Sequence, residues 1–547
     1  MAGLAVGRHV PVRSAPELVH LPTRSSQPVA SFVRPVADPE TLRRLATTAI
    51  DAAIQAGADW ADVRIGDRRY LAGDTIKLTY GFGVRVRVGN AEAFLGGGSP
   101  TPERMIRAAR SATATARGII RERTWSAELA RPLAPTPVIK GEWHAPIAID
   151  PFTVPVDDHW LAGRSNRGAN DIRLRASVGG NKSRMGGATW YSETRVFASS
   201  EGSLLTQFLG GATVGMWTLE DRLWRREIGT TNLIWVPGDD LESCTAGFEV
   251  VVRPDRHERL EALGREIDRY RALPYGWADV GRYNVVLDGS AHAALLQEML
   301  VPALSLRRVL GEDADVDGLS PFMPPADWVG QDIAAQPLSM QVDAGAPRYG
   351  AAAWDDEGVA TKTSPLVVDG KLVRFLTSRA TAPLMAASAT SGADGGHSES
   401  AAAAALLGTA RVTDVTHQPL ELPPSISALP GSGGSITALA KQMGTGILVR
   451  GAYVTVNPQG TGGFIDPSLA FEVRRGELVR RIGRFRFSFS SKKMLKNLVA
   501  MGDASTLRSY TGHQVVSFPW TDLDTVVRAP AATYKNIDLT TNLSLSA

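Results

Sequence analysis

The sequence predicts an α+β protein with an N-terminal α/β domain and a β-rich C-terminal domain. The chain has 547 residues, which is more than one hydrophobic core usually holds. Its first part alternates helical and strand patterns, which indicates helices layered on a sheet. Closely spaced strand patterns fill residues 447–489 and favour a barrel or a sandwich. We place the domains at 38–275 and 280–547, with Pro274 marking the boundary.

The composition is that of an ordinary globular protein, with 44% hydrophobic and 21% charged residues. The formal net charge of +3 is spread along the chain, so it gives no reason to expect nucleic acid as a partner. Cys244 is the only cysteine, which excludes an internal disulfide and a multi-cysteine zinc site; we expect a small buried side chain there. No apolar run approaches the roughly 18 residues of a membrane-spanning helix. We therefore expect a cytoplasmic protein with no membrane partner.

Residues 1–37 are interpreted as a flexible N-terminal extension. Four arginines lie here among Pro, Ser and Val, without the apolar stretch of a secretory signal. A transit peptide is the alternative, but Glu17 and several prolines argue against it.

The N-terminal domain opens with a helix. Asp38 can cap this helix, Pro39 suits its first turn and Gly57 ends it. An alternating segment, Asp59–Ile65, predicts a strand. Two more strands are expected over Thr75–Tyr80 and Gly83–Val88, around a glycine turn at Gly81 and Gly83, and a second helix from Pro102 to about Ala116.

The rest of this domain is predicted to be a connector, several strands and a closing helix. Residues 125–156 are rich in proline and read as a surface connector. The expected elements that follow are strands over Ile172–Val178, Ala188–Ser192, Arg195–Ser199 and Leu204–Trp217, and a helix over about 254–273.

The C-terminal domain begins with a strand pattern, Tyr283–Asp288, followed by a helix that Ser290 can cap. The helix carries an apolar stripe with Glu298 at its edge. Further strands are expected at Gly350–Trp354 and around a hairpin whose Asp-Gly pair favours a type I′ turn. Residues 386–434 are rich in Ala, Ser, Gly and Pro and are interpreted as a surface excursion.

Five short phrases, in this order, resemble the TldD/PmbA (TldE) family of metallopeptidase-related proteins, also described as modulators of DNA gyrase. The phrases are Gly81–Val86, Ala198–Gly202, Trp354–Val359, Leu366–Leu372 and Gly444–Val449. The resemblance implies an N-terminal α/β domain, a β-rich C-terminal domain with a barrel-like curved sheet, and dimers whose substrate cleft lies in the C-terminal domain.

The resemblance also implies that the zinc motif of the family is degraded in this chain. In the TldD branch, a helix after the first strand of the C-terminal domain carries HExxxH, whose histidines bind zinc while the glutamate polarises water. Here the equivalent positions are Gln297, Glu298 and Pro302. The glutamate is kept as a residual catalytic candidate, whereas glutamine is a poor zinc ligand, and proline offers no side-chain donor and ends or kinks the helix.

A cysteine ligand that the family implies near the C-terminus is also missing, since residues 508–517 contain none. We therefore expect no metal and no cofactor in this chain, zinc belonging to the active branch. His513 is the one zinc-capable histidine of that segment, and a surface or hydrogen-bonded role is preferred for it. His292 lies at a helix N-terminus, which disfavours its charge, and a single histidine is no site.

Three other motifs receive structural interpretations. The run Asp355-Asp356-Glu357 resembles a metal cluster, but its alternating side chains favour turn formation ahead of Gly358. The pair His257-Glu258 is interpreted as solvated. Basic residues over 474–496 alternate with Phe485, Phe487 and Phe489, which share one strand face and are assigned to the core, ahead of a site for nucleic acid or a peptide carboxylate.

The functional expectation is a TldE-like subunit, inactive alone, that binds extended peptides and works with a zinc-bearing TldD-type partner. Thr445, Gly446, Ile447, His397 and His513 are the candidates for the peptide cleft. Two alternatives remain open: a metal-independent or repurposed hydrolase that uses Glu298 as general acid or base, and a regulatory homodimer.

Overall fold

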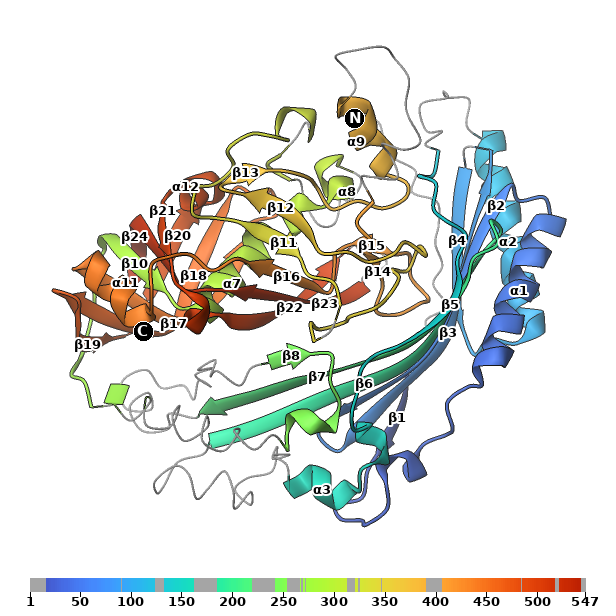
Figure 1. Cartoon of the computed structure of the whole chain (residues 1–547), viewed down its shortest axis with the longest axis horizontal. Helices are drawn as coiled ribbons and strands as arrows, with labels where there is room; N and C mark the ends of the chain where they lie inside the picture. The colour runs from blue at the N-terminus through green and yellow to red at the C-terminus, as the bar shows by residue number, and fades with distance from the viewer. Residues whose placement is uncertain are drawn as a thin grey trace.

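The computed structural model describes both domains of the chain (Figure 1). The described residues are 16–542 except 90, 123–131, 162–183, 219–241, 253–265, 267–268, 271, 312–319, 323–324, 346, 390–405, 484 and 517–520. The strand Ile172–Val178, the pair His257-Glu258, His397 and most of the helix expected over 254–273 lie outside them.

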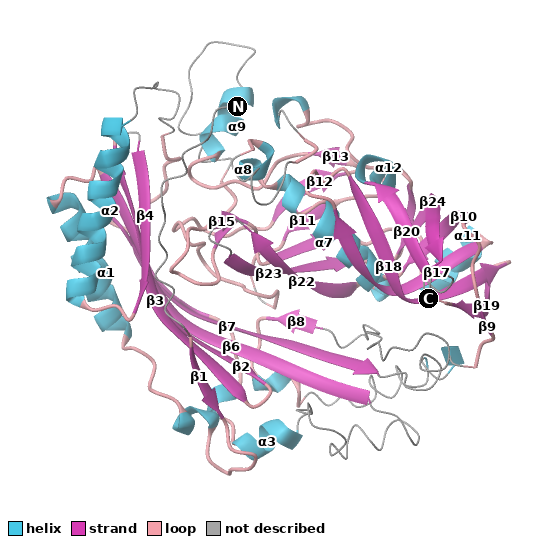
Figure 2. Ribbon diagram, turned by 180° about the vertical axis from the view of Figure 1, so that it is seen from behind, coloured by secondary structure: helices cyan, strands magenta, loops and turns pink. Residues whose placement is uncertain are grey.

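The N-terminal domain is one long, curved sheet with two helices on its outer face (Figures 1 and 2). Its strands follow the order β1-β3-β2-β6-β7-β5, with β4 paired to β3 and β8 to β7. The elements are β1 Glu17–His20, α1 Pro39–Gln55, β2 Trp60–Ala72, β3 Thr75–Val88, β4 Ala91–Gly98, α2 Pro102–Glu122, β5 Lys140–His144, α3 Val156–Leu161, β6 Arg184–Ser199, β7 Leu204–Thr218 and β8 Glu242–Cys244.

The start of α1 confirms the predicted capping. The Asp38 side chain accepts a hydrogen bond from the Thr41 N–H at 2.9 Å, which satisfies one of the free donors of the first turn. Pro39 is the first helical residue, and Gly57 ends the helix with a φ of 89°, which favours glycine. The buried face of α1 packs with α2 on the sheet.

Two predictions for this domain are wrong in detail. The segment at the start is not wholly an extension, because Glu17–His20 pairs with β3 and the Arg34 guanidinium binds both Asp67 carboxylate oxygens at 2.7 Å. The connector contains β5, which adds parallel to β7. In both cases the edge of a long strand offers unpaired backbone groups, which a nearby segment satisfies.

The expected turn at Gly81 and Gly83 is also wrong, since both residues lie inside the continuous strand β3. A β-carbon on Gly83 would lie 2.4 Å from the Val415 carbonyl oxygen, and one on Gly96 would lie 2.0 Å from that of Thr416. These glycines therefore admit the close approach of the 414–417 loop from the C-terminal domain.

The C-terminal domain has a closed ring of five strands, β17-β10-β24-β20-β18, because β18 also pairs with β17. A separate six-stranded sheet has the order β13-β12-β11-β16-β23-β22. Helix α7 packs on β17 of the ring and on β22 and β23 of the other sheet. The predicted α+β class and barrel-like curvature are confirmed.

The elements of this domain run from β9 to β24. They are β9 Tyr275–Gly276, β10 Gly281–Leu287, α7 Gly289–Met299, α8 Leu306–Val309, β11 Met340–Val342, β12 Ser364–Val368, β13 Lys371–Leu372, α9 Ala382–Ala389, β14 Ala410–Arg411, β15 Leu420–Glu421, β16 Ser425–Ala428, α11 Ile436–Met443, β17 Gly446–Val456, β18 Gly462–Arg474, β19 Glu477–Ile482, β20 Phe485–Ser490, α12 Ser491–Lys496, β21 Leu498–Met501, β22 Arg508–Val516, β23 Thr521–Ala529 and β24 Ala532–Asn542.

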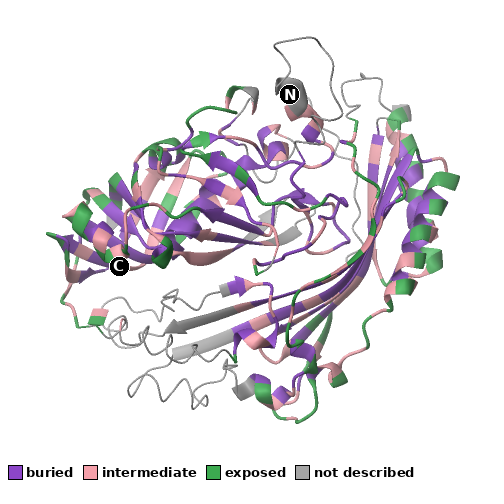
Figure 3. Cartoon of the chain, viewed as in Figure 1, coloured by how far each residue is buried: buried purple, intermediate pink, exposed green. Residues whose placement is uncertain are grey.

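The hairpin turn was predicted correctly, whereas the surface excursion was not. Asp369 and Gly370 have φ values of 48° and 79° between β12 and β13, as a type I′ turn requires. Residues 406–428 of the predicted excursion are largely buried between the domains (Figure 3) and include three short strands. The expected strand Gly350–Trp354 is irregular, with one isolated bridge at Trp354.

Candidate functional site

Helix α7, which carries the degraded motif, is fixed at its N-terminus by Asp288. The Asp288 carboxylate accepts from the Ala291 N–H at 2.8 Å and from the Ser290 hydroxyl at 2.7 Å, and it lies 3.1 Å from Arg450 Nε. Asp288 is therefore the cap, not Ser290 as predicted. The helix starts at Gly289, one residue before the serine, because Asp288 has the extended backbone that a cap requires.

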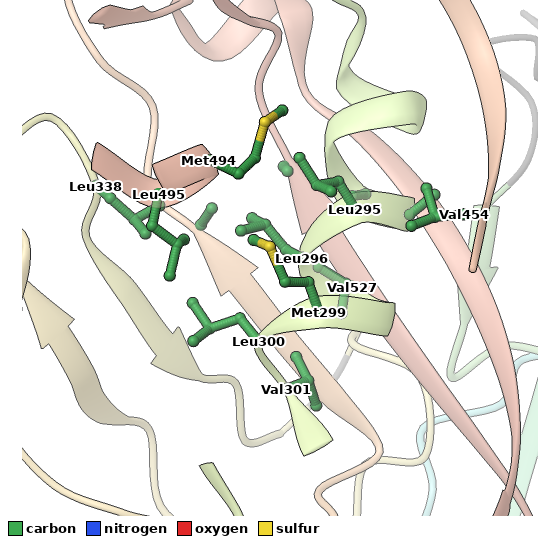
Figure 4. Close-up of a cluster of buried hydrophobic side chains, with 14 of the residues drawn as sticks. Leu295, Leu296, Met299, Leu300, Val301, Leu338, Val454, Met494, Leu495 and Val527 are labelled. Carbon is green, nitrogen blue, oxygen red and sulfur yellow. The ribbon is translucent and has the colours of Figure 1, made fainter. Parts of the chain in front are cut away.

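The body of α7 is apolar on almost every side and lies in the main core of the domain. Figure 4 shows its side chains among residues from several other elements. The labelled side chains are Leu295, Leu296, Met299, Leu300 and Val301 at α7 and, around them, Leu338, Val454, Met494, Leu495 and Val527. A helix that is apolar nearly all round is buried in the core, which is where α7 lies.

Gln297, at the first histidine position of the motif, is completely buried. It packs on Gly512 of β22, where an added β-carbon would lie 2.4 Å from Gln297 Cγ and 2.5 Å from its Nε2. Gly512 belongs to the segment in which the resemblance places a cysteine ligand. The first histidine position of the motif therefore lies against a glycine of that segment.

Pro302, at the second histidine position, lies beyond the end of α7, as predicted. The helix ends at Met299, and the N–H groups of Leu300 and Val301 both bond to the Leu296 carbonyl, at 2.9 and 3.0 Å. Pro302 then begins a short 3₁₀ turn, Pro302–Leu304.

These residues do not fit a zinc ion. Zinc in proteins takes imidazole, thiolate or carboxylate ligands. The two histidine positions hold glutamine and proline, and residues 508–517 contain no cysteine. Within the described ranges, no group of three or more His, Cys, Asp or Glu side chains could hold a metal ion.

Glu298 is half-buried next to this dismantled site. Burial raises the pKa of its carboxyl to about 7, and no hydrogen bond or ion pair to another described residue compensates it. Burial raises the pKa of Tyr510 to about 12, with further contributions from the nearby Glu298 and Tyr453. Burial is the largest cause of both shifts.

The histidine candidates do not complete a site with Glu298. His292 is fully buried, and its Nδ1 lies 2.7 Å from the Pro530 carbonyl oxygen, so it donates there. Burial lowers the pKa of His292 to about 4. His513 lies in β22 opposite Asp524, and its side chain is outside the described part of the chain.

The two cleft candidates on β17, Gly446 and Ile447, do not offer a free backbone edge. Ile447 is paired with Val285 of β10 on one side and with Glu472 of β18 on the other, and Gly446 is paired with Val473. Thr445 is exposed just before this strand. Strand addition by a peptide at Gly446 and Ile447 would require one of these pairings to break. By contrast, β22 is the last strand of its sheet among the residues that the structure describes.

The acidic run at 355–357 is a buried structural element, as interpreted. Asp355 accepts hydrogen bonds from the backbone N–H groups of Glu357, Val359 and Ala410, at 2.9 to 3.0 Å. Burial, with the neighbouring Glu357, raises the pKa of Asp355 to about 8.

Ion pairs with the N-terminal domain hold the other two carboxylates of this run, a role that sequence reasoning missed. Asp356 Oδ1 lies 2.6 Å from Arg195, and Glu357 Oε1 lies 2.7 Å from Arg85. The pKa of Glu357 is lowered overall. Burial alone would raise it, but Arg85 and the hydrogen bond from the Arg379 N–H outweigh burial. No local pattern signals these pairs, because the partners lie in distant strands.

The aromatic residues of the basic stretch are part of the core, as interpreted. Phe485 and Phe487 are buried in β20, with ring centroids 4.9 Å apart. Cys244 is partly buried against the N-terminal core. In the part of the chain that is described, no helix is both long and apolar enough to cross a membrane.

Comparison with known proteins gives one family match and one curated relative. Residues 280–533 match the model of the PmbA/TldA metallopeptidase C-terminal domain. A protein of Methanothermobacter thermautotrophicus named a metalloprotease is 24% identical over 266 residues, which is 48% of this chain and 52% of that protein. The chain thus spans about half the length of the curated relative that it matches.

Solved structures share the fold over most of the chain. TldE from Thermococcus kodakarensis matches 91% of this chain and 100% of its own, with a TM-score of 0.60 and 13% identity. A candidate modulator of a DNA gyrase from Thermotoga maritima matches 91% of this chain and 99% of its own, with a TM-score of 0.63 and 13% identity. A candidate modulator of DNA gyrase from Bacteroides thetaiotaomicron matches 91% of this chain and 99% of its own, with a TM-score of 0.59 and 14% identity. At these identities the matches show a shared fold.

Proposed function

Since this chain is a member of the TldD/PmbA family, we propose that it is a non-catalytic, TldE-like subunit that binds extended peptides for a zinc-bearing TldD-type partner. The observation that carries this proposal is the packing of Gln297 on Gly512. There the first histidine position of the motif holds a glutamine, and it packs against a segment without cysteine, so neither offers zinc a suitable donor. The site is closed by packing, so a single histidine at either end would not restore it.

Peptide binding by strand addition is supported by the position of β22. This nine-residue strand pairs with β23 on one side and, in the described part of the chain, is the last strand of its sheet. An edge strand presents unpaired N–H and C=O groups that an extended peptide can use. Helix α7 packs against β22, and Gly512 of β22 contacts Gln297, so a peptide added to this edge would lie beside the strand that contacts the degraded motif. We therefore move the proposed cleft from Thr445, Gly446 and Ile447 to β22.

The likeness to TldE of Thermococcus kodakarensis agrees with this assignment. In the TldD/PmbA family that the five sequence phrases resemble, the TldE branch also lacks the zinc motif and acts with a TldD partner. A cytoplasmic location belongs to the same proposal.

The test is to purify the tagged chain from its native source, identify the chains that accompany it, and then assay it alone and with a zinc-bearing partner. We expect far less than one zinc per chain and no peptidase activity alone. Activity that chelators abolish should return only with the partner. Stoichiometric zinc in the isolated chain, with peptidase activity lost on Glu298→Gln, would overturn the proposal.

A second candidate function, a metal-independent hydrolase, is favoured by one observation. A carboxyl with a pKa of about 7 is suited to general acid and base catalysis near neutral pH. Hydrolysis by the isolated chain that resists chelators and is lost on Glu298→Gln would support it. Glu477→Gln, an exposed carboxylate on β19, is the matched control and should keep full activity. An inactive chain that forms only a dimer of itself would favour the regulatory homodimer.

A further inference from the structure

The two faces of β22 meet different surroundings. Successive side chains of a strand point to opposite faces, so Tyr510 and Gly512 share one face and Thr511 lies on the other. The contacts agree with this alternation. Gly512 packs on Gln297 of α7, and Tyr510 packs against the main core of the C-terminal domain. Thr511 instead contacts a strand of the N-terminal domain. One face of β22 is therefore turned towards α7 and the other towards the N-terminal sheet.

The face towards α7 is apolar at Tyr510. Val527 lies opposite Tyr510 in β23 and is fully buried in the same core. Tyr510 itself is only partly buried, so its ring leaves apolar surface that a neighbouring strand can cover. Aromatic and β-branched residues pair favourably across strands. A strand added beside β22 is therefore stabilised most by an aliphatic side chain next to Tyr510.

The face towards the N-terminal domain carries hydroxyl groups at the edge strand. The Thr511 hydroxyl lies 2.6 Å from the Ser243 hydroxyl of β8, which lies 3.0 Å from the Thr213 hydroxyl of β7. Figures 1 and 2 show β8 next to β22. A hydroxyl has one donor and two acceptor sites, so this chain of hydroxyls keeps capacity for a further hydrogen bond. Val526 is apolar on the same face, but it belongs to β23 and lies one strand further from the edge.

We propose that the peptides bound at β22 alternate apolar residues with threonine or serine. An added strand presents alternate side chains to opposite faces, and a slip by one residue exchanges the two sets. An alternating peptide can therefore match Tyr510 on one face and Thr511 on the other, whereas a peptide of the same composition without alternation cannot. This inference rests on the proposed peptide-binding function, and it names the class of peptide that the site takes.

The test compares two nine-residue peptides, the length of β22, each made of five valines and four threonines. One peptide alternates the two residues and the other carries them as two blocks, and an added C-terminal lysine holds a fluorophore. Valine and threonine have similar shapes and both favour strands, so the peptides differ in order alone. We expect the alternating peptide to bind the full chain about 5-fold more tightly by fluorescence anisotropy, since each cross-strand pair contributes up to roughly that factor.

Two variants change one face each. Tyr510→Thr makes both faces of the edge strand polar, and Thr511→Val makes both apolar, so each should reduce the preference to less than about 2-fold. Thr511→Ser keeps the hydroxyl and should retain the preference. Thr455→Val, at an exposed position of β17, is the control and should bind as the wild type does. Thermal unfolding verifies that each variant is folded.

The outcomes distinguish this inference from the proposed function. Equal binding of the two peptides by the wild type, or a preference that either Tyr510→Thr or Thr511→Val leaves unchanged, would overturn the alternation and leave peptide binding intact. Failure of both peptides to bind would overturn both proposals.

Discussion

Gln297 of α7 and Gly512 of β22 are in such close contact that a β-carbon on the glycine would lie 2.4 Å from the glutamine Cγ. The two residues are far apart in sequence, yet each limits the size of the side chain that fits at the other position. The contact links the degraded motif to the C-terminal strand and gives a direct way to test how tightly the former metal site is packed.

Gly512→Ala should lower the free energy of unfolding by about 1–3 kcal/mol, because the added methyl group would overlap the fully buried Gln297 side chain. The same substitution made in a Gln297→Ala background should cost much less. Chemical unfolding of the wild type, the two single variants and the double variant measures the coupling energy between Gln297 and Gly512. Gly118→Ala in α2, where nothing lies within 4 Å of the added carbon, is the control and should be neutral or stabilising. Equal costs in both backgrounds would show that Gln297 and Gly512 do not oppose each other.

Gly96→Ala should displace the 414–417 loop from the N-terminal sheet, since the new β-carbon would lie 2.0 Å from the Thr416 carbonyl oxygen. The backbone cannot yield as a side-chain tip can, so the loop has to shift. Hydrogen exchange measured by mass spectrometry should show faster exchange over residues 409–417, with α1 unchanged. Exchange at the wild-type rate over this segment would count against a tight contact, and Gly118→Ala again serves as control.

Arg85→Met should cost about 3–5 kcal/mol of stability, because it leaves two buried carboxylates without their partner. Arg85 lies 2.5 Å from Asp62 and 2.7 Å from Glu357, and all three are buried. Adding Glu357→Gln should restore part of the loss, as urea unfolding can measure. Arg282→Met, which removes an exposed pair with Asp538, should have little effect. A loss as small as that of Arg282→Met would mean that the buried ions are compensated otherwise.

His292→Gln should reduce the loss of stability in mild acid. The folded pKa of His292 is about 4, below its ordinary value of 6.5, because the ring is buried. Between these values the unfolded chain takes up a proton that the folded chain does not, so the stability present above pH 6.5 is lost as pH falls towards 4. The full effect is about 3 kcal/mol.

Urea unfolding at pH 7 and at pH 4.5 measures this difference, with the wild type as reference. Glutamine can still donate to the Pro530 carbonyl, as His292 does at 2.7 Å, which preserves the hydrogen bond. If wild type and variant lose equal stability between the two pH values, His292 does not titrate as its burial requires.

Much of the site was open to prediction from sequence. The loss of both histidine positions and the end of the helix before Pro302 follow from residue chemistry alone, since proline has no N–H and glutamine binds zinc poorly. The half-burial of Glu298 and the contact between Gln297 and Gly512 could not be predicted, because both depend on how separate elements pack.

The sequence by itself determined what local chemistry governs. Asp38 and Pro39 start α1, Asp369 and Gly370 make the type I′ turn, and five ordered phrases indicate the family, because each depends on a few neighbouring residues. Only the tertiary structure decided what depends on distant neighbours. It placed Gly83 inside a strand under the 414–417 loop, and it paired Ile447 on both sides. The local sequence around a glycine or along an alternating strand is the same whether or not another part of the chain packs against it. Only the folded structure shows whether such packing occurs.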